Sequence, residues 1–109
     1  MNLHDYKTSS GKNLIKEYLS SLPRVEMYTG YRIRHMLVKD GIEALAELDT
    51  RQLRGKLWEI RFSQNRIMYV VADSDNIYML HACKKEKGKA EKYELDKAIQ
   101  RAKEYGFNI

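Results

Sequence analysis

Hydrophobic residues near the start of the chain recur every three or four positions, which is the spacing of one face of an α-helix. This series follows a Ser-Ser-Gly opening and consists of Leu14, Ile15, Tyr18, Leu19 and Leu22. Because helices commonly begin just after such a polar opening, the pattern predicts an amphipathic helix over about residues 11–22.

A second helix is predicted from Pro23, the only proline, since a residue without an N–H suits the first turn of a helix. Its apolar face is less regular and follows Met27, Tyr31, Arg34 and Val38. The Asp40-Gly41 pair is a stop signal, and a short apolar piece follows over residues 42–48. We therefore expect the first half of the chain to be helical.

From Leu57 onward the pattern changes to short runs rich in β-branched and aromatic residues. Three such runs cover residues 57–62, 67–72 and 77–82, and they predict three strands. Short polar connectors separate the runs, and connectors of this length join only antiparallel neighbours. The three strands should form an antiparallel meander.

The first predicted strand has two different faces, because side chains alternate across a strand. Trp58, Ile60 and Phe62 lie on one face, whereas Glu59 and Arg61 lie on the other. We expect the first face to pack in the core and the second to be partly polar.

The C-terminal part returns to helical spacing, with Leu95, Ala98, Ile99, Ala102 and Tyr105 on one face and Gly106 as the stop. The chain has no internal repeat and no Gly-, Ser- or Pro-rich linker. We predict a single domain over residues 1–109 with an α+β fold. In this fold N-terminal helices pack on a small antiparallel meander, and a C-terminal helix follows it.

The amino-acid composition indicates in which cellular compartment the protein resides. Apolar residues make up 43% of the 109 residues, enough for one ordinary core, and no run of about 18 apolar residues could cross a bilayer. Residues 1–7 lack the apolar segment of a secretory signal. Cys83 is the only cysteine, which excludes an internal disulfide. We expect a soluble cytoplasmic protein without a membrane partner.

The sequence lacks the characteristic motifs of several enzyme classes. It contains no Gly-rich phosphate loop, no HExxH, no GxSxG and no paired cysteines. Its three histidines, His4, His35 and His81, are scattered among different predicted elements. We therefore expect neither a metal site nor a small-molecule cofactor.

The net charge of +5 favours an acidic partner, and the cations concentrate in two segments. The first carries Arg51, Arg54, Lys56, Arg61 and Arg66, and the second carries Lys84, Lys85, Lys87 and Lys89. In an antiparallel meander the end of the first strand, the start of the second and the end of the third lie together. Arg61, Arg66 and the Lys84-Lys85 pair should therefore converge at one end of the sheet.

Such a cationic site suits RNA cleavage by attack of a 2′-hydroxyl on the adjacent phosphate. That reaction requires removal of one proton, stabilisation of charge on the phosphorane oxygens and protonation of the leaving 5′-oxygen. A guanidinium can bind two phosphate oxygens at once, and exposed tyrosines can stack on bases. Among Tyr69, Tyr78 and Tyr93, we expect Tyr69 to pack in the core instead.

Three segments together resemble the RelE/ParE toxin superfamily, and more narrowly its HigB-like branch, which is related to phage Gp49-type proteins. They are Gly55-Lys56-Leu57-Trp58-Glu59-Ile60-Arg61, Asn65-Arg66-Ile67-Met68-Tyr69-Val70-Val71 and Ile77-Tyr78-Met79-Leu80-His81-Ala82-Cys83-Lys84-Lys85. The similarity covers roughly residues 45–103. It implies a microbial-RNase-like fold, the toxin role of a type II toxin–antitoxin system and ribosome-dependent cleavage of mRNA. It also implies contacts with rRNA and a small helix-turn-helix antitoxin as partner.

The resemblance implies specific roles for some residues. Arg66 corresponds to the arginine expected to stabilise the transition-state phosphate, and Arg61, His81 and Lys85 are further catalytic candidates. Tyr93 corresponds to a tyrosine that aligns the 2′-hydroxyl in RelE proper. The RNA-binding candidates are Arg51, Arg54, Lys56, Lys84, Lys87 and Lys89.

Two departures from the family pattern leave alternatives open. An expected Lys-Thr-Pro reads Lys89-Ala90-Glu91 here, and Ala82-Cys83 replaces an aromatic after the histidine. A topoisomerase-inhibiting toxin of the ParE type is one alternative, although such proteins lack the clustered cations. A catalytically inactive, prophage-derived binding protein is another. The general base, the codon preference and the oligomeric state are open.

Overall fold

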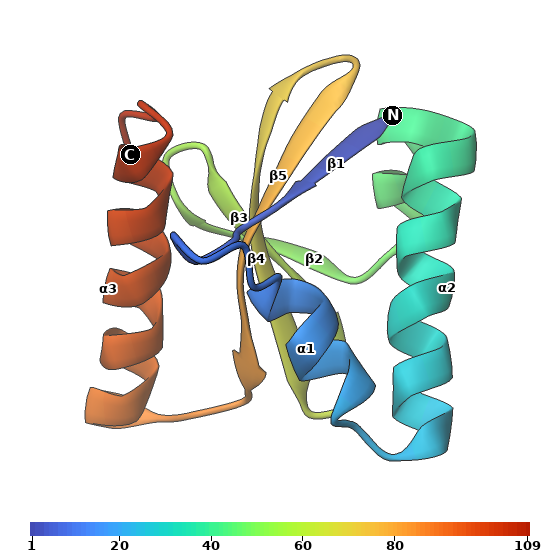
Figure 1. The fold of residues 1–109 in the computed structure, drawn as a ribbon, viewed down its shortest axis with the longest axis horizontal. Helices are drawn as coiled ribbons and strands as arrows, with labels where there is room; N and C mark the ends of the chain where they lie inside the picture. Colours follow the sequence, from blue (N-terminus) through green and yellow to red (C-terminus); the bar gives the residue numbers. More distant parts are fainter.

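The structure, a computed structural model describing residues 1–109, places a five-stranded sheet between two layers of helices (Figure 1). The strands are β1 (Asn2–Asp5), β2 (Thr50–Arg54), β3 (Leu57–Phe62), β4 (Asn65–Asp73) and β5 (Asn76–Lys84). Their order across the sheet is β1-β5-β4-β3-β2. Neighbours from β2 to β5 are antiparallel, and β1 pairs with β5 in parallel.

The helices are α1 (Leu14–Ser20), α2 (Arg24–Asp40), a 3₁₀-helix η1 (Gly41–Glu47) and α3 (Gly88–Glu104). Figure 1 shows α1 and α2 on one side of the sheet and α3 on the other. The α+β class and the C-terminal helix are therefore confirmed. No helix combines the length and apolar character that crossing a membrane requires.

The predicted meander is confirmed as β3–β4–β5, but the expectation of a purely antiparallel sheet is wrong. Two strands that the pattern did not predict extend it, β1 at one edge and β2 at the other. Both are short and polar, and each has a single apolar residue, Leu3 in β1 and Leu53 in β2. A run with one apolar residue has no alternation that could predict a strand.

The helices correct two further expectations, the start of α1 and the buried face of α2. The α1 helix begins at Leu14 rather than residue 11, because the Asn13 side chain caps it by accepting from the N–H groups of Ile15 and Lys16. The α2 helix ends before Gly41 as expected, with Gly41 at a φ of 73°. Its buried residues are Gly30, Ile33 and Leu37, whereas Val38 is exposed.

Two hydrophobic cores lie on opposite faces of the sheet. The first joins α1, α2 and η1 to strand residues that include Ile60, Phe62 and the buried Tyr69, which packs as expected. The second joins α3 to Leu57 and Val70. The expectation that one face of β3 is partly polar is confirmed, because Glu59 and Arg61 line a pocket on that face and only Leu57 packs in the α3 core. On the face expected to pack, Ile60 and Phe62 are buried, but Trp58 is 37% exposed.

A β-bulge in β5 determines which face its last residues occupy. The register passes from Tyr69 opposite Met79 to Met68 opposite His81, so Leu80 is an extra residue. Met79 packs in the α1/α2 core, and without the bulge His81 and Cys83 would share its face. Instead, Leu80 and Cys83 pack in the α3 core, and His81 contacts α3.

Candidate functional site

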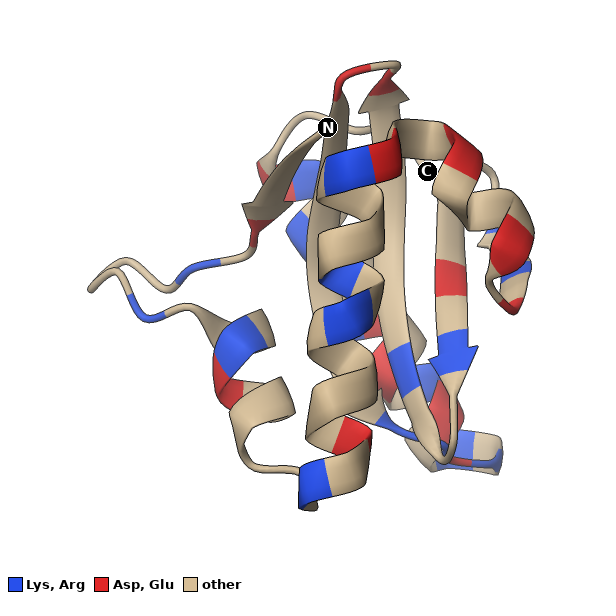
Figure 2. Ribbon diagram, turned by 90° about the vertical axis from the view of Figure 1, so that its right-hand side faces the viewer, with Lys and Arg blue, Asp and Glu red and all other residues tan.

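The cations predicted to converge do lie together at one end of the sheet. Arg61 is opposite Arg66 across β3 and β4, and Arg66 is opposite Cys83 across β4 and β5. Lysine and arginine residues gather at this end of the ribbon, interspersed with acidic residues (Figure 2). The predicted convergence is confirmed, and it follows from the two tight connections of the meander.

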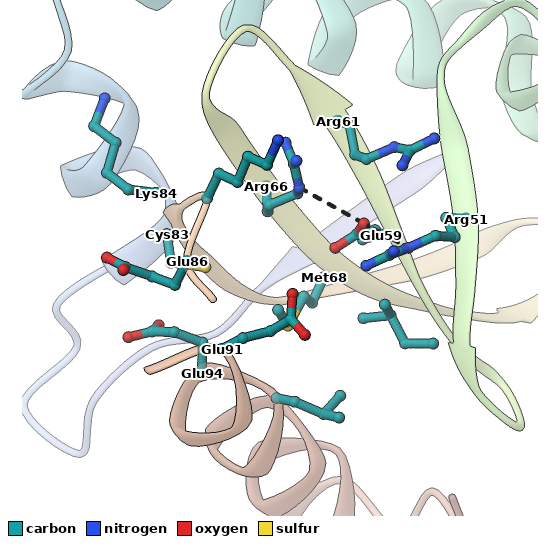
Figure 3. Close-up of a pocket in the computed structure, with 13 residues that line it drawn as sticks. Arg51, Glu59, Arg61, Arg66, Met68, Cys83, Lys84, Glu86, Glu91 and Glu94 are labelled. Carbon is teal, nitrogen blue, oxygen red and sulfur yellow. Dashed lines mark ion pairs between the residues drawn. The ribbon is translucent and has the colours of Figure 1, made fainter. Parts of the chain in front are cut away.

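A pocket of about 230 Å³ opens between this end of the sheet and the start of α3 (Figure 3). It is lined by Arg51, Leu53, Glu59, Arg61, Arg66, Met68, Cys83, Lys84, Lys85, Glu86, Glu91, Glu94 and Leu95. Four glutamates thus accompany the cations. The expectation of a purely cationic site is incomplete, and the acidic residues supply groups able to accept protons.

Glu59 holds two arginines of the pocket. Its side chain is only 2% exposed, and Oε2 lies 3.1 Å from Nε of Arg51 and 3.6 Å from Nε of Arg66. Arg66 also donates from Nη1 to the carbonyl oxygen of Asn65 at 3.0 Å. One hydrogen bond and one ion pair thus restrain the guanidinium of Arg66, and neither involves its Nη2. A fixed guanidinium with free N–H groups is suited to binding an anion.

Arg61 lies beside this group but has a different partner. Its Nη2 donates to Asp49 at 2.8 Å, and this hydrogen bond raises the pKa of Arg61. Its Nε is buried without a hydrogen-bond partner. Arg61 is therefore permanently cationic at the edge of the pocket.

Lys84 and Lys85 are adjacent in sequence, but their side chains have different surroundings. The Lys84 ammonium donates to Oδ1 of the fully buried Asn65 at 3.0 Å and lies 3.8 Å from Glu26. Figure 3 shows this side chain pointing away from the arginines. Lys85 is exposed beside the pocket, with its backbone N–H bonded to the carbonyl oxygen of Gln64. Of the two, only Lys85 has an ammonium that is not engaged by protein groups.

His81 is buried behind the pocket rather than exposed in it. Its Nε2 contacts Oε2 of Glu94 on α3, and its Nδ1 lies 3.0 Å from Nη1 of Arg101. Burial is the main cause that lowers the pKa of His81. The neutral imidazole is therefore favoured at this position.

The ligand atoms of His81, Cys83 and Glu94 lie within 4.8 Å of one another, which is close enough for a metal ion. A metal-binding histidine normally donates its second ring N–H to an acceptor. Here Nδ1 faces a guanidinium, which can only donate. The cluster therefore fits a hydrogen-bonded network better than a metal centre.

Several predicted site residues lie outside the pocket. Tyr93 is exposed on α3, with the ammonium of Lys97 4.7 Å from its ring centre. Lys87 and Lys89 are exposed just before and at the start of α3, and Arg54 is exposed at the β2–β3 turn, at the other end of β3 from Arg61. Lys56 lines a separate groove that also contains Trp58 and Tyr69. Glu94 and Arg101 were not predicted, since the contacts that reveal them join residues 13 and 20 positions apart.

Comparison with protein families identifies the class of protein to which this fold and pocket belong. The model of the family described as phage-derived protein Gp49-like (DUF891) matches residues 17–103. The chain belongs to this Gp49-like family. No curated protein matches the sequence.

Proposed function

We propose that this protein is the toxin of a type II toxin–antitoxin pair, related to the RelE/ParE superfamily, and that it cleaves mRNA on the ribosome. Membership of a phage-derived family supports this role. The observation that carries the proposal is the guanidinium of Arg66. Glu59 and the backbone of Asn65 fix it, while Nη2 remains free beside a solvent-accessible pocket.

The proposed reaction uses the RNA's own 2′-hydroxyl as nucleophile. Arg66 binds the non-bridging oxygens of the scissile phosphate and stabilises the charge that develops on them in the transition state. Arg61 and Lys85 contribute further positive charge around that phosphate, and Arg51 holds Glu59 from the other side. Stabilisation of the transition-state charge by donors that are already in place is usually the largest single contribution to the rate enhancement of an enzyme.

The exposed cations Lys87 and Lys89, close in sequence to the pocket residues Lys85, Glu86 and Glu91, and Arg54 at the β2–β3 turn would bind the phosphates of mRNA and rRNA. Contacts of this kind release counterions, so binding should weaken strongly as salt is raised. The same surface would attract an acidic segment of the helix-turn-helix antitoxin. The site of action under this proposal is the cytoplasm, where ribosomes translate mRNA.

Induced expression in a bacterial cell without the antitoxin tests the proposal. Wild type should arrest growth and create new mRNA 5′ ends within translated frames, whereas Arg66→Ala should do neither. Arg32→Ala is the matched control, because Arg32 is exposed on α2 across the sheet from the pocket and has no acidic partner. It should remain as toxic as wild type.

Other outcomes favour the alternatives. Growth arrest with intact mRNA and damaged DNA would support a topoisomerase inhibitor. A folded wild-type protein without toxicity would support an inactive binding protein.

A further inference from the structure

Of the four glutamates in the pocket, Glu94 alone is both accessible and fixed in place. Glu59 is 2% exposed and is paired with two arginines, which block its approach to a ligand. Glu86 and Glu91 are exposed and have no protein partner. The Glu94 side chain lines the pocket (Figure 3). It is 21% exposed and contacts the buried His81.

The contact between His81 and Glu94 has a defined direction. Arg101 can only donate, so Nδ1 of the neutral imidazole must be the acceptor of its hydrogen bond. The imidazole proton therefore resides on Nε2 and is donated to Oε2 of Glu94. The thiol of Cys83 also faces Glu94.

Arg101 is itself held from three sides. Besides Nδ1 of His81, its Nη1 donates to the carbonyl oxygen of Leu80 at 3.0 Å, and its guanidinium lies 4.4 Å from the ring centre of Tyr6. Leu80 is the bulged residue of β5, so the bulge places the carbonyl that orients Arg101. A chain of contacts thus runs from the sheet through Arg101 and His81 to Glu94.

A general base must hold its proton-accepting oxygen in one place and still reach the substrate. Glu94 meets both conditions, since one oxygen accepts from His81 and the carboxylate borders the pocket. It rises from α3 on the side of the pocket opposite Arg66 (Figure 3). A phosphodiester bound by Arg66 would thus have a carboxylate on its other side.

We infer that Glu94 is the general base of the cleavage reaction, and that His81 and Arg101 are positioning residues for it. This inference rests on the proposed nuclease function. Glu94 takes the proton of the 2′-hydroxyl, and the 2′-oxygen forms a bond to phosphorus. The P–O5′ bond breaks, and the leaving 5′-oxygen takes a proton from water. The products are a 2′,3′-cyclic phosphate and a 5′-hydroxyl, and Glu94 returns its proton to solvent.

Single-turnover cleavage of mRNA on purified, programmed ribosomes tests this assignment. Glu94→Gln keeps an acceptor for His81 but cannot take a proton. The cleavage rate should fall by about 100-fold or more, the scale of a lost general base, while the affinity for ribosomes is unchanged. Glu43→Gln is the matched control and should cleave like wild type, because Glu43 is exposed on η1, on the face of the sheet opposite α3.

Two variants of His81 distinguish its hydrogen bond to Glu94 from its contribution to core packing. In His81→Gln the side-chain amide can still donate to Glu94, so most of the cleavage rate should return relative to His81→Leu, which has no donor. Thermal unfolding of each variant sets an assay temperature at which all are folded. Equal loss of activity in both variants would contradict the positioning role.

The outcomes distinguish this inference from the proposed function. If wild type and Glu94→Gln cleave mRNA at the same rate, the assignment of Glu94 is wrong and the nuclease function stands. If wild-type protein leaves ribosome-bound mRNA intact, the nuclease function is wrong, and the assignment of Glu94 is overturned with it.

Discussion

Arg34 and Asp5 form two parallel hydrogen bonds of 2.7 Å each, which join the middle of α2 to the end of β1. The two side chains are only 11% and 5% exposed. Asn13, the cap of α1, donates to the same carboxylate at 2.9 Å. The buried ion pair and the Asn13 side chain together therefore connect α2, β1 and the start of α1.

Asp5→Asn should destabilise the protein by about 3 kcal/mol, because removing one partner leaves Arg34 buried without a counter-charge. Urea unfolding measures this change. The exposed pair of Lys12 and Glu17 offers a comparison, since Glu17→Gln should cost less than about 1 kcal/mol. Equal effects of the two substitutions would contradict the importance of burial.

Glu59→Gln should affect both stability and cleavage. It leaves Arg66 mostly buried without an acidic partner, so we expect a loss of about 3 kcal/mol in unfolding free energy. Glu94→Gln should cost much less stability, because its partner His81 is neutral. Urea unfolding of both variants, set beside their cleavage rates, checks this difference. Comparable destabilisation by both would argue against it.

Lys84→Ala should mainly affect stability and Lys85→Ala should mainly affect RNA binding, although the two residues are adjacent. Lys84 is bonded to buried Asn65, so its loss should lower stability by about 1 kcal/mol and leave RNA affinity nearly unchanged. Lys85 is free beside the pocket, so its loss should weaken RNA binding and reduce the salt dependence of that binding by about one unit of slope. Salt titrations of binding and urea unfolding separate the two, and the reverse pattern would contradict the structure.

Acidification should weaken the fold through His81. Burial lowers the pKa of His81 in the folded state below its ordinary value of 6.5. The unfolded chain therefore binds a proton at this position at higher pH than the folded chain does, and stability falls as the pH drops below 6.5. Urea unfolding at several pH values should show this decrease in wild type and a smaller one in His81→Gln. An identical pH dependence in both would exclude His81 as its source.

Cys83 should react slowly while the protein is folded. It is 8% exposed, and burial, together with the negative charge of Glu94, raises the pKa of its thiol to about 12. Since the thiolate is the reactive form, modification by an aromatic disulfide should be at least about 100-fold slower than in denaturant. A spectrophotometric thiol assay with and without denaturant measures the ratio. Fast reaction of the folded protein would show that Cys83 is accessible.

Local sequence patterns predicted the long helices and the β3–β4–β5 meander well. Each of these elements is encoded by consecutive residues, such as the apolar run of β4 or the Asp40-Gly41 stop of α2. The edge strands β1 and β2 could not be predicted in this way. Their residues are mostly polar, and they form strands because β5 and β3 supply the pairing partners.

The residues of the pocket also fall into two groups. The positions of some follow from the sequence, and the positions of others depend on tertiary packing. Arg61 and Arg66 flank one tight turn, so their proximity follows from chain connectivity alone. The position of Glu94 depends instead on the packing of α3 against the sheet. The orientation of Lys84 likewise depends on Asn65 and on Glu26 of α2.

The sequence by itself determined the class of fold, the order of its principal elements and the convergence of the arginines, because these depend on short-range periodicity and short connections. The tertiary structure alone decided that His81 and Cys83 face α3. Strict alternation from Ile77 and Met79 would have directed them to the opposite face, and the bulge at Leu80 reverses that assignment. The cause is physical: a one-residue shift in pairing depends on contacts between strands and changes the face of every residue that follows.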